Sequence, residues 1–153
     1  MTRPVDVTGH PLAGNFRIDK NGVWFHDDEE VTHERTWKYL SGSLNVDDGG
    51  QVYLTDGKVR IDVEVEDAPL VVTALRATPD GVRLRLHDDT YANLDPATIA
   101  FKANTPYCAA RNGLTAKFST AAYMQLAEYI EEDGDAYTLV LGGKRYPLPI
   151  QRS

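Results

Sequence analysis

The sequence predicts an α+β fold in which two similar halves each contain antiparallel β-hairpins and one main helix. Three observations support this class. Glycine turns separate short runs of alternating apolar residues, which indicates hairpins. Two windows carry apolar residues at helical spacing. No strand–helix–strand crossover pattern is present, so parallel α/β architecture is not expected.

A chain of 153 residues is long enough for one domain or for two small ones that share a core. We expect an irregular arm over residues 1–15, where proline and glycine recur. The first half is predicted over residues 16–76 and the second over residues 77–153.

The first half is predicted to start with a hairpin and to continue into a helix. Residues 16–25 alternate around Asn21-Gly22, a pair that favours the positive φ values of a type I′ turn. Thr32 is the predicted helix N-cap, and the helix is expected to end near Gly49-Gly50. Its expected apolar face consists of Trp37, Leu40 and Leu44.

Two more hairpins are predicted before the second half repeats the pattern. The first joins 52–54 to 59–65 across Asp56-Gly57, and the second joins 70–75 to 82–86 across Pro79-Asp80-Gly81. The alternation in 59–65 is clear: valine and isoleucine occupy one face and charged residues the other.

The second half is predicted to use the same order of elements. A hairpin surrounds Asn112-Gly113, and a helix follows with Ser119 or Thr120 as its cap. The helix is expected to end at Asp133-Gly134, and a last hairpin turns at Gly142-Gly143. Its apolar stripe would contain Tyr123, Leu126, Ala127 and Ile130. The repeated order predicts an internal duplication, with coincidence of a short, common pattern as the alternative.

Charge and cysteine content narrow the classes of function. A net charge of -7 argues against nonspecific binding to nucleic acid or to an anionic membrane surface. No apolar run approaches the roughly 18 residues of a membrane span, and no secretory signal is expected. The single Cys108 is expected to be a buried, inert thiol, and a cytoplasmic location is the expectation for such a chain.

A search for catalytic motifs gives only weak signals. Phosphate-binding loops and nucleophile elbows are absent from the sequence. The triplet His-Asp-Asp occurs at 26–28 and at 87–89, and imidazole beside carboxylates is typical of metal sites and of general bases. However, neighbouring residues of a strand point to opposite faces, so the triplets are better interpreted as turn residues. We expect no cofactor, no metal and no catalytic residue.

Basic residues define the candidate ligand site. Lys58 and Arg60 share one strand face, and Arg83, Arg85 and His87 share another. The ligand-binding residues predicted from the sequence are Trp24 as a stacking wall, Lys58, Arg60, Arg111 and Lys117. Lys117 would act with backbone N–H groups at the start of the second helix. We expect this site between the halves, although alternating charges also occur on any solvated sheet face.

Three segments resemble a known bacterial family. The segments Val63–Leu70, Ile18–Phe25 and Tyr107–Lys117 are similar to the family called domain of unknown function 1285, and the similarity covers about residues 16–148. The matching positions are Trp24, Glu66, Asp67, Pro69, Arg111 and Gly113. The chain departs from the family pattern at Thr55–Lys58, where Thr-Pro-x-Glu is expected, and at Thr120, where a basic residue is expected.

The resemblance implies a duplicated α+β fold whose C-terminal half is similar to a pleckstrin-homology domain. It also implies an interface site for a nucleotide-type ligand and a signalling role. The leading hypothesis is therefore a non-enzymatic module that binds a small, nucleotide-type ligand. The alternatives are a scaffold or homodimer that uses an exposed sheet edge with a protein partner of unknown identity, and a hydrolase that uses His26 or His87.

Overall fold

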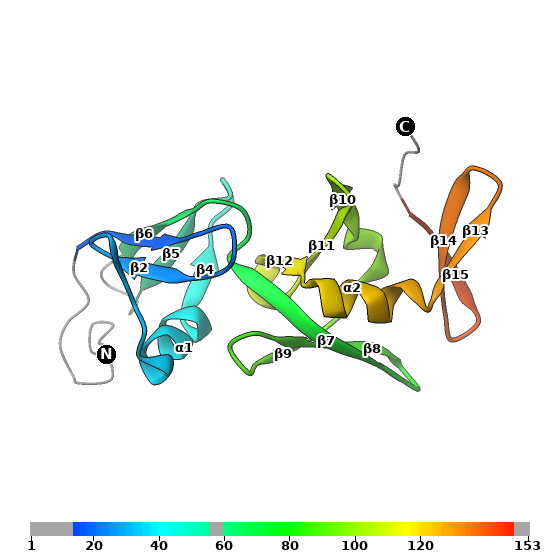
Figure 1. Ribbon diagram of the computed structural model, residues 1–153, viewed down its shortest axis with the longest axis horizontal. Helices are drawn as coiled ribbons and strands as arrows, with labels where there is room; N and C mark the ends of the chain where they lie inside the picture. Colours follow the sequence, from blue (N-terminus) through cyan, green and yellow to red (C-terminus); the bar gives the residue numbers. More distant parts are fainter. Residues whose placement is uncertain (1–13, 56–59, 149–153) are drawn as a thin grey trace. The chain divides into compact units, whose positions relative to one another are not determined.

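The computed structural model describes residues 14–55 and 60–148, and these residues form two compact units. The first unit takes in the chain up to Leu70 together with Asn112–Leu114, and the second holds Val71–Arg111 and the chain from Thr115 on. The described part contains two α-helices, two six-stranded sheets and one three-stranded sheet (Figure 1). The predicted α+β class is confirmed.

The first unit contains a six-stranded mixed sheet. The strand order is β3-β2-β1-β6-β5-β4. The strands are β1 (Phe16–Ile18), β2 (Trp24–His26), β3 (Glu29–Glu30), β4 (Leu44–Val46), β5 (Val52–Thr55) and β6 (Arg60–Val65). β1 pairs antiparallel with β2 and parallel with β6. Local patterning predicts the hairpins but not this parallel contact between distant segments.

The hairpin between β1 and β2 turns at Asn21-Gly22, as predicted, but the turn type differs. Only Gly22 of the pair has a positive φ, of 82°, whereas a type I′ turn needs positive φ at both central residues. The carboxylate of Asp19 accepts hydrogen bonds from the backbone N–H groups of Asn21 and Val23. These bonds hold the turn in a different geometry.

Helix α1 (Glu34–Gly42) is shorter than predicted and begins one residue later. His33, not Thr32, is its N-cap, and no side chain caps this end. The helix ends where the backbone N–H of Ser43 donates to the carbonyl of Leu40. Leu44 belongs to β4 and pairs with Leu54, so the prediction that it continues the helical stripe is wrong. Its spacing from Leu40 fits a helix, but pairing with β5 determines its conformation.

The second unit contains the other six-stranded sheet, with the order β10-β11-β12-β7-β8-β9. The strands are β7 (Leu70–Thr78), β8 (Gly81–Leu86), β9 (Tyr91–Asn93), β10 (Ala100–Lys102), β11 (Thr105–Ala109) and β12 (Thr115–Phe118). Two short 3-10 helices, η1 (Pro96–Thr98) and η2 (Arg111–Gly113), lie in the connections. The hairpin of β7 and β8 confirms the prediction across Pro79-Asp80-Gly81, with longer strands.

Helix α2 (Thr120–Ala127) is capped by Ser119, whose hydroxyl accepts a hydrogen bond from the N–H of Ala122. This confirms one of the two predicted caps. The helix ends at Ala127, and Ile130 instead begins β13 (Ile130–Asp133), where it pairs with Leu139. The predicted extension of the helix to Asp133-Gly134 is therefore wrong.

The chain ends in a three-stranded antiparallel sheet of β13, β14 (Ala136–Leu141) and β15 (Lys144–Leu148). Gly142 and Gly143 have φ values of 55° and 81°, which confirms the last predicted turn. The internal duplication and the likeness to a pleckstrin-homology domain stay predictions. The first unit extends to Leu70 rather than to residue 76, and it also includes a segment from the predicted second half.

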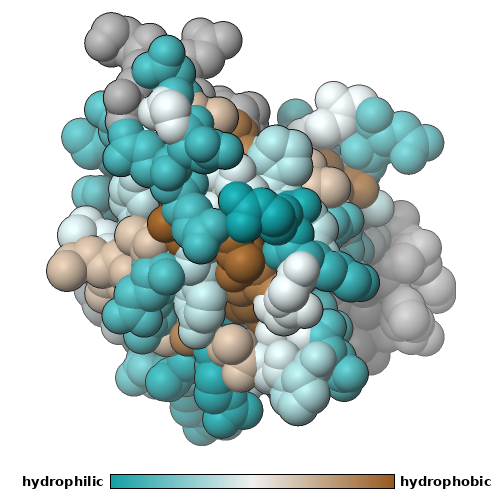
Figure 2. Space-filling model, turned by 90° about the vertical axis from the view of Figure 1, so that its right-hand side faces the viewer, coloured by the Kyte–Doolittle hydropathy of each residue, from teal (hydrophilic) through white to brown (hydrophobic). Residues whose placement is uncertain are grey.

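Figure 2 shows one face of the molecule, on which hydrophilic side chains cover most of the surface. Hydrophobic side chains reach this face near its centre and in several smaller areas around it. Scattered apolar exposure of this kind is normal for a protein surface in water.

Neither helix in residues 14–55 and 60–148 is long and apolar enough to cross a membrane.

Candidate functional site

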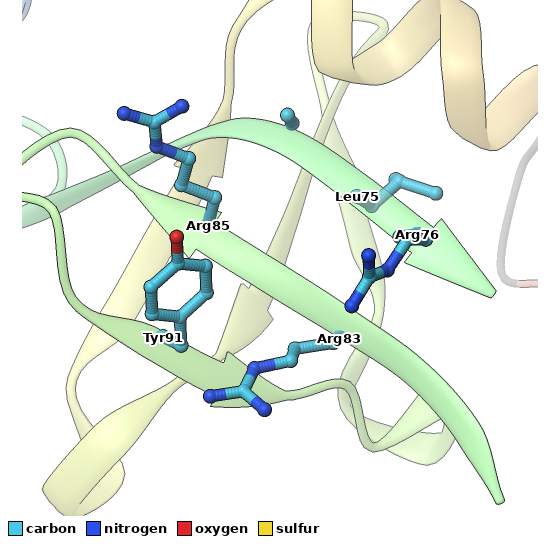
Figure 3. A pocket seen from close by; sticks show the side chains of 6 residues that line it. Leu75, Arg76, Arg83, Arg85 and Tyr91 are labelled. Carbon is cyan, nitrogen blue, oxygen red and sulfur yellow. The ribbon is translucent and has the colours of Figure 1, made fainter. Parts of the chain in front are cut away.

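An open cavity of about 280 Å³ lies on one face of the sheet, over β7, β8 and β9, and is lined by three arginines and one tyrosine. Arg76 comes from β7, Arg83 and Arg85 come from β8, and Tyr91 comes from β9 (Figure 3). Ala74 and Leu75 complete the lining. We call Arg76, Arg83, Arg85 and Tyr91 the arginine face.

The pairing of the strands explains why these side chains share one face. Arg76 is directly opposite Arg83, and Arg85 is directly opposite Tyr91. Directly opposite residues of antiparallel strands point to the same side of a sheet. β8 alternates strictly, because its arginines are exposed while its valine and leucines are buried.

The arginine face concentrates positive charge in an otherwise acidic chain. Like charges directly opposite each other on neighbouring strands destabilise a sheet, and Arg76 and Arg83 are such a pair. Within the described residues, neither of these two arginines forms an ion pair, although the guanidinium of Arg83 lies 4.7 Å from the ring centre of Tyr91. Arg85 is 3.1 Å from the carboxylate of Asp89.

Arg111, a predicted ligand-binding residue, takes part in an enclosed ion pair. Its guanidinium lies 3.0 Å from the carboxylate of Asp88, whose side chain is 0% exposed. It also donates to the hydroxyl of Thr90 at 2.7 Å. The Asp88 carboxylate accepts a further hydrogen bond from the N–H of Thr90 at 3.1 Å. These contacts connect the β8–β9 turn to the end of β11.

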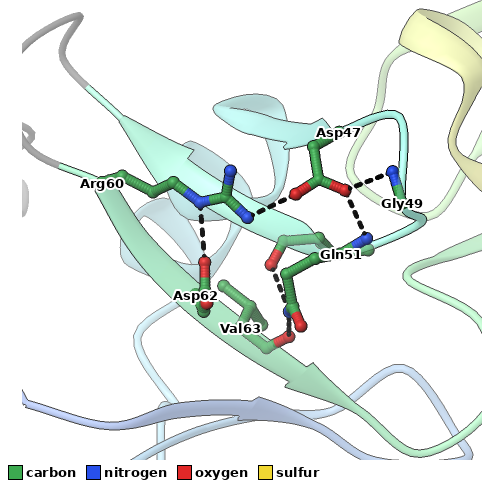
Figure 4. Close-up of polar contacts among 7 residues, drawn as sticks. Asp47, Gly49, Gln51, Arg60, Asp62 and Val63 are labelled. Carbon is green, nitrogen blue, oxygen red and sulfur yellow. Dashed lines mark hydrogen bonds and ion pairs between the residues drawn. The ribbon is translucent and has the colours of Figure 1, made fainter.

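Arg60, another predicted ligand-binding residue, is held between two carboxylates (Figure 4). It lies 2.7 Å from Asp47 and 2.8 Å from Asp62, and its guanidinium is 4.2 Å from the ring centre of Tyr53. Asp47 also accepts backbone N–H bonds from Gly49 and Gln51 at 2.9 Å each.

These contacts shift both ionisable groups of the pair. The hydrogen bond from Arg60 and the backbone bonds hold the pKa of Asp47 below its usual value. The hydrogen bonds to Asp47 and Asp62 raise the pKa of Arg60. Both shifts favour the charged forms of Asp47 and Arg60, whose ion pair holds the β4–β5 connection.

Trp24 has no exposed ring face on which a ligand can stack. It is 1% exposed and packs edge-on against Phe16, at 6.3 Å between ring centres. This burial on the inner face of its sheet does not favour the predicted stacking role, which stays a prediction.

The other predicted site residues are divided between the two units, and one lies outside the described part of the chain. Lys58 lies outside the described residues. Lys117 is half-buried on β12, opposite Tyr107. Trp24 and Arg60 belong to the first unit, and Arg111 and Lys117 belong to the second. A ligand role for the four basic residues stays a prediction.

The start of α2 offers fewer donors than the sequence suggested. The N–H of Ala122 is bonded to Ser119, and the N–H of Tyr123 donates to the Ser119 carbonyl. One of the N–H groups expected to receive an anion beside Lys117 is therefore already occupied.

Both His-Asp-Asp triplets lie at turns, as predicted, and the positive φ values of Asp27, Asp28 and Asp89 mark these turns. In the second triplet, the ring Nδ1 of His87 accepts a bond from the N–H of Val71, while Asp88 and Asp89 pair with different arginines. The described residues contain no group of three potential ligands that would hold a metal ion.

The first triplet brings its imidazole close to one carboxylate. His26 Nε2 is 3.6 Å from an Asp27 carboxylate oxygen, and the ring stacks on Phe16 at 4.4 Å between centres. The hydrolase alternative stays a prediction.

Cys108 is 2% exposed, as expected from its strand position. Burial raises the pKa of its thiol to about 12, so the thiolate is absent at neutral pH.

The segment most specific to the resembled family has a clear structural role. Glu66 accepts hydrogen bonds from the guanidinium of Arg17 and from the N–H of Lys20, both at 3.0 Å. Ala68 and Pro69 are buried. The segment thus connects the end of β6 to the first hairpin.

Sequence reasoning noted the shared face of Arg83 and Arg85 but included none of the four residues of the arginine face in the predicted site. An arginine near a strand end and a tyrosine in an irregular stretch carry no signal by themselves. If the first predicted strand, 70–75, had been extended toward the turn in the same register with 82–86, Arg76 would have been placed opposite Arg83.

Comparisons with known proteins show the fold. No family model matches the chain, and no curated protein matches it. A DUF1285 family protein from Silicibacter pomeroyi DSS-3 superposes with a TM-score of 0.74 at 20% identity, covering 92% of this chain and 82% of that one. A DUF1285 family protein from Shewanella baltica OS155 superposes with a TM-score of 0.67 at 21% identity, covering 76% of this chain and 92% of that one. The resemblance found in the sequence motifs is thereby confirmed, and the chain has the fold of the domain of unknown function 1285 proteins.

Proposed function

We propose that this protein is a non-enzymatic module that binds a small anionic ligand of nucleotide type, and that the ligand binds at the arginine face. The observation that supports this is that three arginines and one exposed tyrosine ring line a single cavity, although the guanidinium of Arg85 extends away from the other two (Figure 3).

The unfavourable repulsion among these arginines supports a role in binding an anion. The chain has 23 acidic and only 16 basic residues, yet no acidic residue lines this cavity. A solvated sheet face explains exposed charges, but it does not explain like charges placed directly opposite each other. An anionic ligand would turn this repulsion into attraction.

The residue types suit a nucleotide. A guanidinium presents a planar fork of donors that matches phosphate oxygens, and arginine stays charged in proteins. Tyr91 is 52% exposed and offers a ring surface on which a base stacks. Binding without turnover is the chemistry of a sensor, so the signalling role implied by the resemblance forms part of the proposal.

Thermal shift with a panel of nucleotides tests the proposal. A ligand at 100 times its dissociation constant adds about 2.7 kcal/mol to the free energy of unfolding. We expect this stabilisation in the wild type and its loss in Arg83→Gln, which removes one guanidinium from the cavity.

The matched control is Arg145→Gln. Arg145 is an exposed arginine on β15 that pairs with Glu131, and its replacement changes the net charge by the same amount as Arg83→Gln. A panel without any stabilising nucleotide would refute the proposal. Equal losses in both variants would also contradict it, because the effect would then come from net charge alone.

A further inference from the structure

We infer that the arginine face selects the dianion of a phosphate monoester, and that Asp89 is the counter-ion that this ligand displaces from Arg85. The inference rests on the proposed function and specifies the ligand's charged group.

The charge of the site matches a dianion. Arg76, Arg83 and Arg85 bring three positive charges and Asp89 in the adjacent turn brings one negative charge, so this group of four residues has a net charge of +2 whether or not Asp89 contacts Arg85. A phosphate monoester carries about -1.5 to -2 charges at neutral pH. A phosphodiester or a carboxylate carries only about -1, and would leave one guanidinium unmatched.

The number of oxygens points the same way. A phosphate monoester presents three strong acceptor oxygens, whereas a diester has only two that are not esterified. Arg76 and Arg83 extend from directly opposite positions of two strands, so their side chains start about 5 Å apart. Two guanidinium groups can therefore hold two oxygens, and the third oxygen is left for Arg85.

Asp89 forms an ion pair with the third guanidinium, that of Arg85. It lies in the β8–β9 turn with φ of 65°, a conformation that aspartate and asparagine adopt more easily than other residues with side chains. Its ion pair with Arg85 is half-exposed on both sides, and such surface pairs contribute only about 0–1 kcal/mol. A dianion with several charge-assisted bonds outcompetes it.

The size of the cavity limits the rest of the ligand. At about 280 Å³ it lies near the lower end of the roughly 300–1,000 Å³ that small-molecule sites occupy. This favours one ring system beside the phosphate over a dinucleotide. Two sources supply this chemistry: a free mononucleotide, and a phosphorylated tyrosine side chain.

Isothermal titration calorimetry with 5′-AMP, 3′,5′-cyclic AMP and O-phosphotyrosine tests the inference. The two nucleotides share a base and sugar and differ in the ester. We expect the better monoester to bind about tenfold or more tightly than cyclic AMP, the value of one additional charge-assisted hydrogen bond. Whether AMP or phosphotyrosine binds more tightly identifies the source, and either result supports selection of a monoester. Binding of phosphotyrosine alone would refute the nucleotide part of the proposed function.

The pH dependence provides a second readout. The second pKa of a phosphate monoester is about 6, so about a tenth of it is dianionic at about pH 5, and we expect monoester affinity to fall up to about tenfold between pH 7.5 and pH 5. The charged and titratable groups that line the cavity are Arg76, Arg83, Arg85 and Tyr91, and Asp89 pairs with Arg85 beside it. The phosphodiester of cyclic AMP does not titrate in this pH range, so any change in the affinity for cyclic AMP with pH reports the contribution of these protein groups.

Two variants test the roles of Arg85 and Asp89. Arg85→Gln removes the third guanidinium and should reduce the preference for the monoester. Asp89→Asn keeps a residue that tolerates positive φ but removes the competing charge, and should tighten monoester binding several-fold by the same electrostatic reasoning. Circular dichroism melting of both variants verifies that they are folded.

The outcomes separate this inference from the proposed function. Equal affinity for AMP and cyclic AMP, with parallel pH profiles and sensitivity to Arg83→Gln, would overturn the selectivity while leaving the anion site in place. Absence of binding by every compound, or binding that Arg83→Gln leaves unchanged, would overturn both.

Discussion

Asp88 and Arg111 form an ion pair from which water is largely excluded. The carboxylate side chain is fully enclosed, and that of Arg111 is only 16% exposed. An ion pair in this position is a weak source of net stability, but removing one partner leaves the other charge without compensation. The ion pair with Asp88 therefore gives Arg111 a structural role that does not depend on a ligand.

We expect Asp88→Ala to lower the free energy of unfolding by about 3–5 kcal/mol, as measured by urea denaturation. The control is Asp62→Ala, since Asp62 pairs with Arg60 at the surface and its loss should cost about 1 kcal/mol or less. Similar values for the two variants would contradict the assignment of a structural role to the enclosed pair.

Asp47 gives the molecule a specific sensitivity to acid. Because Arg60 and the backbone lower its pKa in the folded state, the unfolded state binds the proton more readily. The stabilisation is present above the unfolded-state pKa and disappears as the pH falls through the lower, folded-state pKa.

Replacing Asp47 with asparagine should therefore remove part of the acid destabilisation. We expect wild type and Asp47→Asn to differ most in urea midpoint near neutral pH and to converge as the pH falls toward the lowest values at which both fold. A constant difference across the whole pH range would show that the loop bonds, and not the charge, account for the effect.

At the scale of elements, the β7–β8 hairpin carries an unfavourable charge pair. The like charges of Arg76 and Arg83 face each other across the strands. If these arginines are maintained for binding, replacing one of them with a neutral residue should stabilise the protein without ligand and should weaken its affinity for the anion.

We expect Arg76→Gln to raise the unfolding free energy of the ligand-free protein by roughly 0.2–1 kcal/mol, the value of a cross-strand pair. The measurement is a thermal melt at low and high salt, because screening should reduce the gain. Arg145→Gln, which breaks an ion pair with Glu131, should show no gain. Destabilisation by Arg76→Gln would contradict the idea of a charge conflict in the hairpin.

The elements that the sequence predicted correctly are those whose signal is local. Glycine turns at Gly22, Gly81 and Gly142-Gly143 mark hairpins because few other residues accept such backbone angles. The helix ends were misplaced because Leu44 and Ile130 fit a helical stripe, while their strand partners are distant in the chain. For the same reason the sequence did not predict the arginine face, because its residues are brought together by the pairing of three strands, β7, β8 and β9.

At the scale of the whole molecule, the division into units does not follow the order of the chain. Asn112–Leu114 belongs to the first unit, although the second unit contains the residues on either side. Leu114 is 1% exposed. The predicted boundary at residue 76 would remove this leucine from the unit that includes it.

We therefore expect a fragment of residues 1–76 to lack cooperative unfolding under conditions where the full chain unfolds cooperatively. Loss of a buried leucine side chain typically costs about 2–5 kcal/mol, a large fraction of the stability of a small unit. Near-ultraviolet circular dichroism during a thermal melt measures this. A fragment that melts as sharply as the full chain would show that Asn112–Leu114 is dispensable for the first unit.

The insertion of Asn112–Leu114 into the first unit also has a consequence for biosynthesis. A ribosome delivers the chain from its N-terminus, and domains usually fold as they emerge. Here we expect the earlier unit to complete its interior only when three residues that are translated after β7–β11 have emerged. Until then the nascent chain exposes an incomplete apolar interior to chaperones and proteases, and so its folding is tied to completion of the later portion.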